Sequence, residues 1–251
     1  MSGQDHLAGR VICAGLGPGA PDLISLRAAR AIGNARHIAF FRKKGRAGRA
    51  RTIAEGLIPQ GATEHAMEYP VTTELPFGSD EYRGLLARFY DDWADRIATL
   101  ARSEDVVVLC EGDPFFYGSF MHLHLRLQTR ARIEVIPGIT GMSGCWTATG
   151  RPVTWGDDVL TVLPGTLEQA ELTRRLRDCD AAVIMKTGRN LSRIRAAVIG
   201  AGRIADAWLC IEGTMPGQRI ARLGDAGDDC PYFATVILHG NGRRPLAGAA
   251  E

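Results

Sequence analysis

Short apolar runs alternate with amphipathic segments along the first half of the chain. Four short, mostly apolar runs are predicted to be strands, at residues 11–14, 37–41, 106–110 and 133–136. Residues 81–102 repeat apolar side chains at helical spacing, and residues 118–128 are predicted to form a second helix. A further helix is predicted to begin at Pro21-Asp22 and to end at Gly33-Asn34. This alternation predicts a mainly parallel sheet covered by helices.

The second half of the chain has the same elements in a less regular order. Its predicted strands are residues 159–163, 181–185, 207–211 and 232–238, and its predicted helices are residues 167–177 and 190–200. The change in character favours a boundary near Pro137-Gly138. We therefore expect an α/β protein of two α/β domains, residues 1–137 with the glycine-rich loops and residues 138–251, with a ligand cleft between them.

Three glycine-bearing loops follow directly after predicted strands. They are residues 15–19 (GLGPG), residues 111–118 (EGDPFFYG) and residues 137–144 (PGITGMSG). Ligands of open α/β sheets bind at the carboxyl ends of strands, and glycine there lets the backbone approach a ligand closely. Three such loops predict one shared small-molecule site.

Composition and charge narrow the function classes. The chain has 251 residues, of which 45% are hydrophobic and 23% charged, and a net charge of +2, so nothing in bulk indicates nucleic acid or a membrane as partner. Residues 1–9 are polar and no apolar stretch approaches the length of a membrane span, so we expect a cytoplasmic protein. The six cysteines are scattered without metal-ligand spacing, which predicts buried thiols, no metal site and no cysteine chemistry.

The first loop, with its pattern G-x-G-P-G, invites a dinucleotide-binding interpretation. Pro18 stiffens the turn, and Ala20 stands where the last fingerprint glycine is expected. The second strand runs into Arg42-Lys43-Lys44 instead of the acidic residue that would hold a ribose hydroxyl. These departures disfavour a nicotinamide oxidoreductase, which stays a rival hypothesis beside a bare tight turn.

Taken together, the motifs resemble the tetrapyrrole (class III) methyltransferases. The family's marks stand here in order as Gly15–Gly19, as Gly112-Asp113-Pro114, as residues 135–140 (VIPGIT) and as residues 183–186 (VIMK). The resemblance covers nearly the whole chain and implies the tetrapyrrole methylase fold, S-adenosylmethionine as cofactor and a homodimer. Residues 111–120, 138–146 and 154–164 most resemble the branch that methylates C-20 of precorrin-2 to precorrin-3A in cobalamin biosynthesis.

Two alternatives to that activity stay open. The same methylation on cobalt-factor II, in the anaerobic route, is not distinguished by any spacing. A tetrapyrrole carrier without enzymatic activity is disfavoured, because a carrier has no use for a methyl donor. The resemblance requires neither a metal nor a covalent nucleophile in the protein.

The resemblance also implies which residues contact the cofactor: Pro18, Gly112, Asp113, Tyr117, Thr140, Gly141, Met185, Gly213 and Thr214. Three of these residues have a structural alternative. Asp113 before proline is typical of a turn or helix cap, Met185 of a core, and Thr140 of a helix N-cap.

The basic segment after the second strand is expected to bind the substrate. Arg42, Lys43, Lys44 and Arg46 would steer and hold the carboxylates of a tetrapyrrole, although a solvated surface loop is the alternative. No aromatic residues interleave with these cations, which disfavours nucleic-acid binding. Glu111, Tyr117 and His122 are the candidates for managing the proton that must leave the methylated carbon, with His124 nearby; none is assigned as the base.

Overall fold

The computed structural model describes residues 8–71, 75, 78–227, 230–231, 233–240 and 242. The chain forms two compact units, Met1–Thr140 and Gly141–Glu251. Each unit contains its own five-stranded sheet, which confirms the α/β class. Within the described residues, no helix combines the length and the apolar character needed to cross a membrane.

The first unit is a parallel sheet with helices on both faces. Its strands are β1 (Val11–Gly15), β2 (His37–Arg42), β3 (Thr63–Glu68), β4 (Val106–Cys110) and β5 (Ile133–Ile136). The strand order is β3-β2-β4-β1-β5, and every neighbouring pair is parallel. The helices are α1 (Leu26–Gly33), α2 (Arg49–Ala54), α3 (Asp80–Leu100) and α4 (Phe120–Leu127), with short 3-10 turns η1 (Pro21–Leu23) and η2 (Glu55–Leu57).

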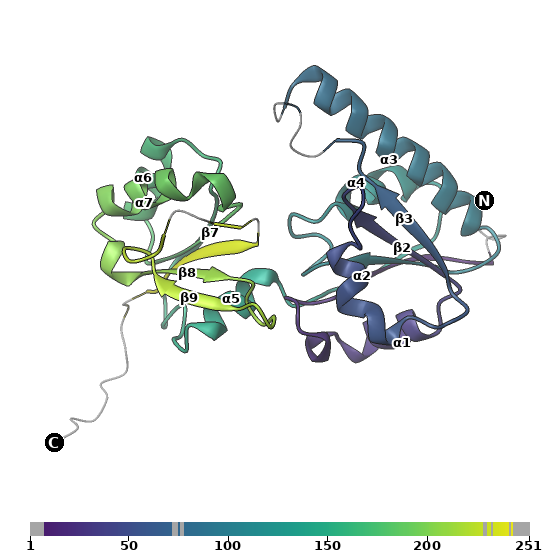
Figure 1. Ribbon diagram of the computed structural model, residues 1–251, viewed down its shortest axis with the longest axis horizontal. Coiled ribbons are helices and arrows are strands. Elements are labelled where there is room, and N and C mark those ends of the chain that lie inside the picture. The colour runs from purple at the N-terminus through teal and green to yellow at the C-terminus, as the bar shows by residue number, and fades with distance from the viewer. Residues whose placement is uncertain are drawn as a thin grey trace. The chain divides into compact units, whose positions relative to one another are not determined.

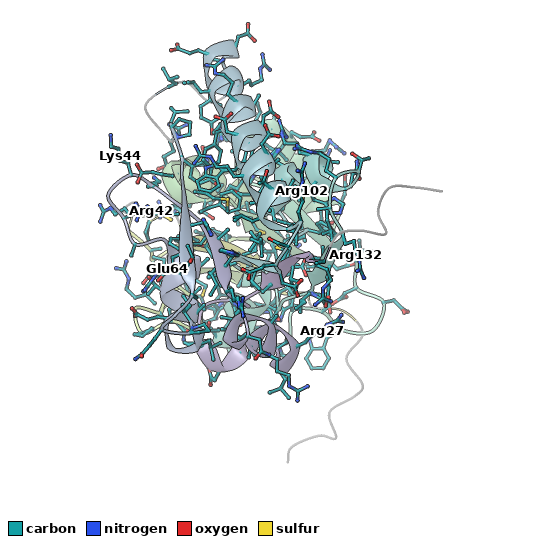
Figure 2. The ribbon with its side chains drawn as sticks, turned by 90° about the vertical axis from the view of Figure 1, so that its right-hand side faces the viewer. Arg27, Arg42, Lys44, Glu64, Arg102 and Arg132 are labelled. Atoms are coloured by element: carbon teal, nitrogen blue, oxygen red, sulfur yellow. The ribbon has the colours of Figure 1, made fainter. Side chains whose placement is uncertain are left out.

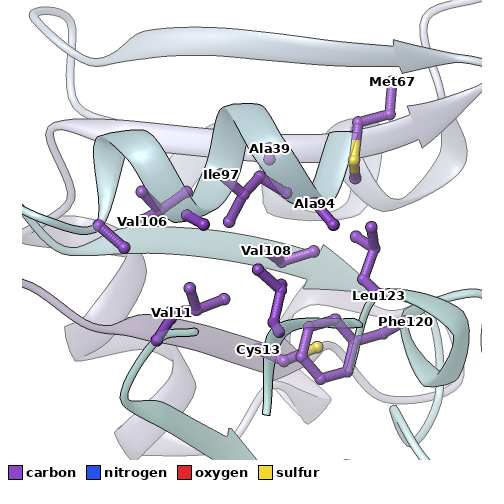
Figure 3. Close-up of a cluster of buried hydrophobic side chains, with 14 of the residues drawn as sticks. Val11, Cys13, Ala39, Met67, Ala94, Ile97, Val106, Val108, Phe120 and Leu123 are labelled. Atoms are coloured by element: carbon purple, nitrogen blue, oxygen red, sulfur yellow. The ribbon is translucent and has the colours of Figure 1, made fainter. Parts of the chain in front are cut away.

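Alternate residues of each central strand enter two different cores. Val11 and Cys13 pack with α3 and α4, whereas Ile12 and Ala14 pack with α1 and α2. Figure 1 shows these helix pairs on opposite sides of the sheet, and Figure 3 shows the first of the two cores. Because both faces are covered, β1 and β4 are buried along their whole length, which explains their unbroken apolar runs.

The strand order places the predicted loops next to one another. The chain leaves β1 toward β2 and leaves β4 toward β5, in opposite directions across the sheet, so β1 and β4 flank the point where the order reverses. Ligands of open α/β sheets bind at the carboxyl ends of strands at such a point. The carboxyl ends of β2, β4, β1 and β5 carry, in this order, the basic segment and the second, first and third glycine loops.

The second unit has a mixed sheet of order β6-β7-β10-β8-β9. Its strands are β6 (Leu160–Pro164), β7 (Ala181–Met185), β8 (Ala207–Ile211), β9 (Arg219–Arg222) and β10 (Ala234–Leu238), and its helices are α5 (Gly141–Ala148), α6 (Gln169–Arg177) and α7 (Leu191–Gly200), with 3-10 turns η3 (Gly188–Asn190) and η4 (Ile204–Asp206). β10 runs antiparallel to both of its neighbours. Helices α6 and α7 cover one face, and α5 packs on the other.

Several elements differ from the sequence predictions for physical reasons. The first helix does not begin at Pro21: Pro21–Leu23 forms a separate turn, and α1 begins at Leu26, where the Ser25 hydroxyl accepts a hydrogen bond from the Ala28 N–H at 3.2 Å. Strands β3 and β9 were not predicted because both are edge strands with exposed polar residues. The predicted strand 232–238 begins at Ala234, and Tyr232 lies outside the described residues.

Candidate functional site

The first two glycine loops are joined backbone to backbone. The Gly112 N–H donates to the Gly17 carbonyl at 2.9 Å, and the Gly17 N–H donates to the Gly112 carbonyl at 3.3 Å. Both residues have positive φ, 78° for Gly17 and 61° for Gly112, which glycine adopts without a steric cost. Pro18, half-buried, follows directly at the tip of the first loop. The pairing holds the tips of β1 and β4 together.

Asp113 ties the second loop to the third. One carboxylate oxygen accepts from the Phe115 N–H at 2.9 Å, and the other accepts from the Gly138 N–H at 3.1 Å. A side chain on Gly138 has no room, because a Cβ there would lie 2.1 Å from the Gly112 carbonyl oxygen. Both oxygens of Asp113 therefore hold loop backbone: the bond from the Phe115 N–H is the turn role typical of aspartate before proline, whereas the bond from the Gly138 N–H joins two separate loops.

Two aromatic rings project from the second loop beside this junction. Phe115 is 49% exposed and Tyr117 is 44% exposed. Tyr117 has φ of 57°, a conformation that is strained for a residue with a side chain. Exposed aromatic rings on a strained strand-end loop are typical of a ligand site.

The same strain marks the predicted loops of the second unit. The non-glycine residues with positive φ in the described part of the chain are Tyr117, Lys186, Glu212 and Thr214. Lys186 directly follows β7 and its last residue Met185, and Glu212 directly follows β8. Backbone strain clusters at binding and catalytic sites. Lys186, the last residue of the VIMK motif, and Glu212 are thus candidate residues to which the sequence assigned no individual role.

Met185 is the last residue of β7, and Gly213 lies two residues after the end of β8; β10 separates these two strands in the sheet. The half-buried Met185 accepts, through its carbonyl, a hydrogen bond from the Gly165 N–H at 2.6 Å. A Cβ on Gly213 would lie 2.9 Å from the Cys145 sulfur. Its neighbour Thr214 donates its backbone N–H to the Gln218 side chain at 2.7 Å. Gly213 is therefore held against α5, the helix that begins at Gly141 directly after Thr140.

The Cys145 thiol lies beside Gly213 in the second unit. Hydrogen bonds from Cys210, Thr235 and the Gly213 N–H lower its pKa to about 7, against the opposing effect of burial. Cys145 is itself buried. We assign it to holding the Gly213 backbone, in line with the prediction that the cysteines are structural.

The basic segment leaves β2 at the carboxyl edge of the first sheet. Arg42 is partly engaged, since its guanidinium pairs with Glu68 of β3 at 3.2 Å. Lys43, Lys44 and Arg46 are exposed on a turn closed by the Arg46 N–H donating to the Lys43 carbonyl at 3.1 Å. Figure 2 shows Arg42 and Lys44 at one margin of the unit and Arg102 and Arg132 at the opposite one. The cations on the turn form a separate positive patch beside the glycine loops.

The two remaining proton-transfer candidates, Glu111 and His122, lie in different surroundings. One Glu111 carboxylate oxygen accepts from the Ala50 N–H at 3.1 Å, and burial raises the pKa of this carboxyl despite the nearby Arg49. His122 stacks on Tyr90 with ring centroids 4.6 Å apart, and burial followed by the charge of Arg126 lowers its pKa. Glu111 directly precedes the Gly17–Gly112 junction, whereas His122 lies on α4.

The structure thus brings together most of the predicted residues of the first unit. Gly112 and Asp113 bond to the first and third loops, Pro18 and Tyr117 lie on the loops joined in this way, and the basic turn lies at the neighbouring strand end. In the second unit, the strand-end loops at Met185 and Gly213 belong to the same sheet. What no motif indicated is the set of ties between loops, made by the Glu111 and Asp113 side chains.

Comparison with known proteins adds an independent line of evidence. The sequence model of the Tetrapyrrole (Corrin/Porphyrin) Methylases matches residues 10–226. The chain is 48% identical, over 94% of its length and 98% of the relative, to a precorrin-2 C(20)-methyltransferase from Sinorhizobium sp.. It is 26% identical, over 92% of its length and 96% of the relative, to a cobalt-precorrin-2 C(20)-methyltransferase from Salmonella typhimurium.

A solved structure shares the fold. The uroporphyrin-III C-methyl transferase from Thermus thermophilus, solved with S-adenosyl homocysteine, superposes with a TM-score of 0.65 at 22% identity, over 91% of this chain and 97% of that one. At this identity the likeness supports the architecture of two α/β sheets and no detail of the site.

Proposed function

The chain belongs to the tetrapyrrole methylase family, and we propose that it methylates C-20 of precorrin-2 with S-adenosylmethionine, giving precorrin-3A in cobalamin biosynthesis. The observation that carries the proposal is the near full-length identity to a precorrin-2 C(20)-methyltransferase. The lower identity to a cobalt-precorrin-2 enzyme favours the metal-free macrocycle over the cobalt-loaded one.

We propose that the cofactor is bound by the loops at the strand ends. The residues proposed to contact the cofactor are, in the first unit, Pro18, Gly112, Asp113, Tyr117 and Thr140, and, in the second unit, Gly141, Met185, Gly213 and Thr214. The Gly17–Gly112 junction supports the proposal, because backbone without side chains leaves room for close approach. The exposed ring of Tyr117 suits stacking or edge contact with a planar ligand. Asp113 contributes by holding the loops in place.

The cofactor supplies an activated methyl group on a sulfonium. Its carbon–sulfur bond breaks as a bond to C-20 forms, and a proton leaves C-20. The contribution of the protein is to hold donor and acceptor in line and to exclude water, which can supply roughly 7–11 kcal/mol of a barrier. The exposed cations Lys43, Lys44 and Arg46, with Arg42 behind them, are proposed to bind the carboxylates of the substrate.

Two further expectations belong to the proposal. The family resemblance implies a homodimer, which light scattering coupled to size-exclusion chromatography would test. We also propose that the enzyme works in the cytoplasm. Neither expectation is needed for the argument on the site.

Isotope labelling tests the activity and its position together. The protein is incubated with precorrin-2 and S-adenosylmethionine carrying a ¹³C-methyl group, with and without cobalt in the macrocycle, and the product is analysed by NMR. We expect the label on C-20 of the metal-free macrocycle. No transfer, or transfer to another ring position, would overturn the proposal, and transfer only to the cobalt form would reassign the substrate.

A further inference from the structure

We propose that Glu111 is a positioning residue that fixes the cationic turn of residues 43–46 relative to the glycine loops. The inference rests on the proposed function, because it concerns how the substrate's carboxylates are presented to the donor loops. It assigns Glu111 a task different from accepting the proton that leaves C-20.

Glu111 lies at the carboxyl end of β4, the strand next to β2. Strands β2 and β4 are neighbours, and their register pairs Phe40 with Leu109. Two residues further along each strand are Arg42, where the basic segment begins, and Glu111, where the second loop begins. The Glu111 carboxylate therefore stands between the two loops at adjacent strand ends. Glu111 directly precedes Gly112, whose N–H and carbonyl groups both form hydrogen bonds with Gly17 of the first loop.

The Glu111 side chain contacts the backbone at the start of α2. Its carboxylate oxygen accepts from the Ala50 N–H at 3.1 Å, 61 residues away in sequence. Ala50 is in the first turn of α2, which begins three residues after the end of the cationic turn. The charge of Arg49 acts on the same carboxylate from the same turn of helix. One side chain thus connects the second glycine loop to the C-terminal end of the basic segment.

The residue that precedes α2 supplies no side chain that could replace Glu111 as the hydrogen-bond acceptor at the start of this helix. The residue before α2 is Gly48, which has no side chain to cap the helix N–H groups. Gly48 has φ of 88°, and a Cβ there would lie 3.0 Å from the Phe41 carbonyl oxygen. A serine or aspartate at this position is therefore disfavoured by strain and contact. The acceptor has to come from elsewhere, and Glu111 provides it.

A glutamine at position 111 separates positioning from proton transfer. Glu111→Gln keeps an oxygen that accepts from the Ala50 N–H but cannot take up the proton from C-20, whereas Glu111→Ala loses both abilities. Glu55→Ala is the matched control, because Glu55 is an exposed carboxylate at the other end of α2 that pairs with Arg51 at 2.7 Å. Each variant is compared by amide hydrogen exchange over residues 42–54, by KM for precorrin-2, by kcat and by affinity for S-adenosylhomocysteine.

We expect Glu111→Ala to speed exchange over residues 42–54 and to raise KM for precorrin-2 about tenfold, in line with loss of a hydrogen bond to a charged group. Glu111→Gln should stay within about threefold of the wild type in KM and kcat, as should Glu55→Ala. Affinity for S-adenosylhomocysteine should change little in all three.

Two results would overturn the inference. One is wild-type exchange and KM in Glu111→Ala. The other is a collapse of kcat in Glu111→Gln, which would make Glu111 a proton acceptor; this arm decides alone if Glu111→Ala does not fold. Should the wild type transfer no methyl group, the proposed function fails, while the exchange comparison still tests the positioning contact.

Discussion

Replacing Gly138 with alanine is the sharpest test of the loop junction. The added methyl group would lie 2.1 Å from the Gly112 carbonyl oxygen and 2.9 Å from the Gly15 carbonyl carbon. Both neighbours are backbone atoms, so no side chain can rotate away. Ordinary contact begins at 3.4 Å, so the second and third loops must separate by about 1.3 Å (3.4 minus 2.1 Å).

The cost of this separation follows from the contacts it disturbs. Overpacking of a tight site costs roughly 1–3 kcal/mol, and loss of the hydrogen bond from the Gly138 N–H to the Asp113 carboxylate costs about 1.5–3 kcal/mol. We expect Gly138→Ala to lower the free energy of unfolding by about 3 kcal/mol. A displacement of roughly 1 Å in a site also costs about 10²-fold in rate, so methyl transfer should fall by that order.

The assay compares Gly138→Ala with Gly33→Ala. Gly33 ends α1, and a Cβ there meets no atom within 4 Å, so this control should have wild-type activity and equal or slightly higher stability. Denaturant unfolding gives the stability, calorimetry gives the affinity for S-adenosylhomocysteine, and single-turnover experiments give the rate. Wild-type stability, affinity and rate in Gly138→Ala would refute the junction as described.

Three other predictions follow from the same structure. The double substitution Lys43→Glu and Lys44→Glu should raise KM for precorrin-2 by about 5- to 30-fold, and the increase should be smaller at high salt. Affinity for S-adenosylhomocysteine should be unchanged. An unchanged KM in steady-state kinetics would exclude the turn from substrate binding. Gly213→Ala should weaken binding of S-adenosylhomocysteine measured by calorimetry, because its Cβ would lie 2.9 Å from the Cys145 sulfur, and unweakened binding would contradict this role. Burial lowers the pKa of His239, so as the pH falls the unfolded chain binds this proton at a higher pH than the folded chain does. The free energy of unfolding should therefore decrease as the pH drops below about 6.5, and denaturant unfolding of His239→Gln should lack this part of the decrease. The same pH dependence in wild type and variant would disprove the role of His239.

The buried strands were predictable because a strand that is covered on both faces consists of apolar residues throughout. Val106–Cys110 is apolar throughout since it is covered on both faces, and Ala181–Met185 is bounded as the sequence predicts. The edge strand Thr63–Glu68 has no partner strand on one side and is mostly polar and partly exposed, so it lacks the apolar pattern that predicts a strand. Helix Gly141–Ala148 escaped prediction because its glycines and small residues give no clear apolar stripe.

The site was predictable as a set of loops and unpredictable as a set of contacts. The glycine patterns placed three loops at strand ends, and the strand order then made them neighbours. The bonds from Asp113 to Gly138 and from Glu111 to Ala50 span 25 and 61 residues, and no local pattern encodes such a pairing. The strain at Lys186 and Glu212 is likewise a backbone property that residue type does not reveal.

The account stands on the claim that these strand-end loops hold the methyl donor. A crystal structure of the protein with S-adenosylhomocysteine tests it most directly. We predict that the ligand contacts the backbone at Gly112 and Gly213 and the side chain of Met185, with the Gly17–Gly112 pairing unchanged. A ligand bound away from these loops would contradict the account.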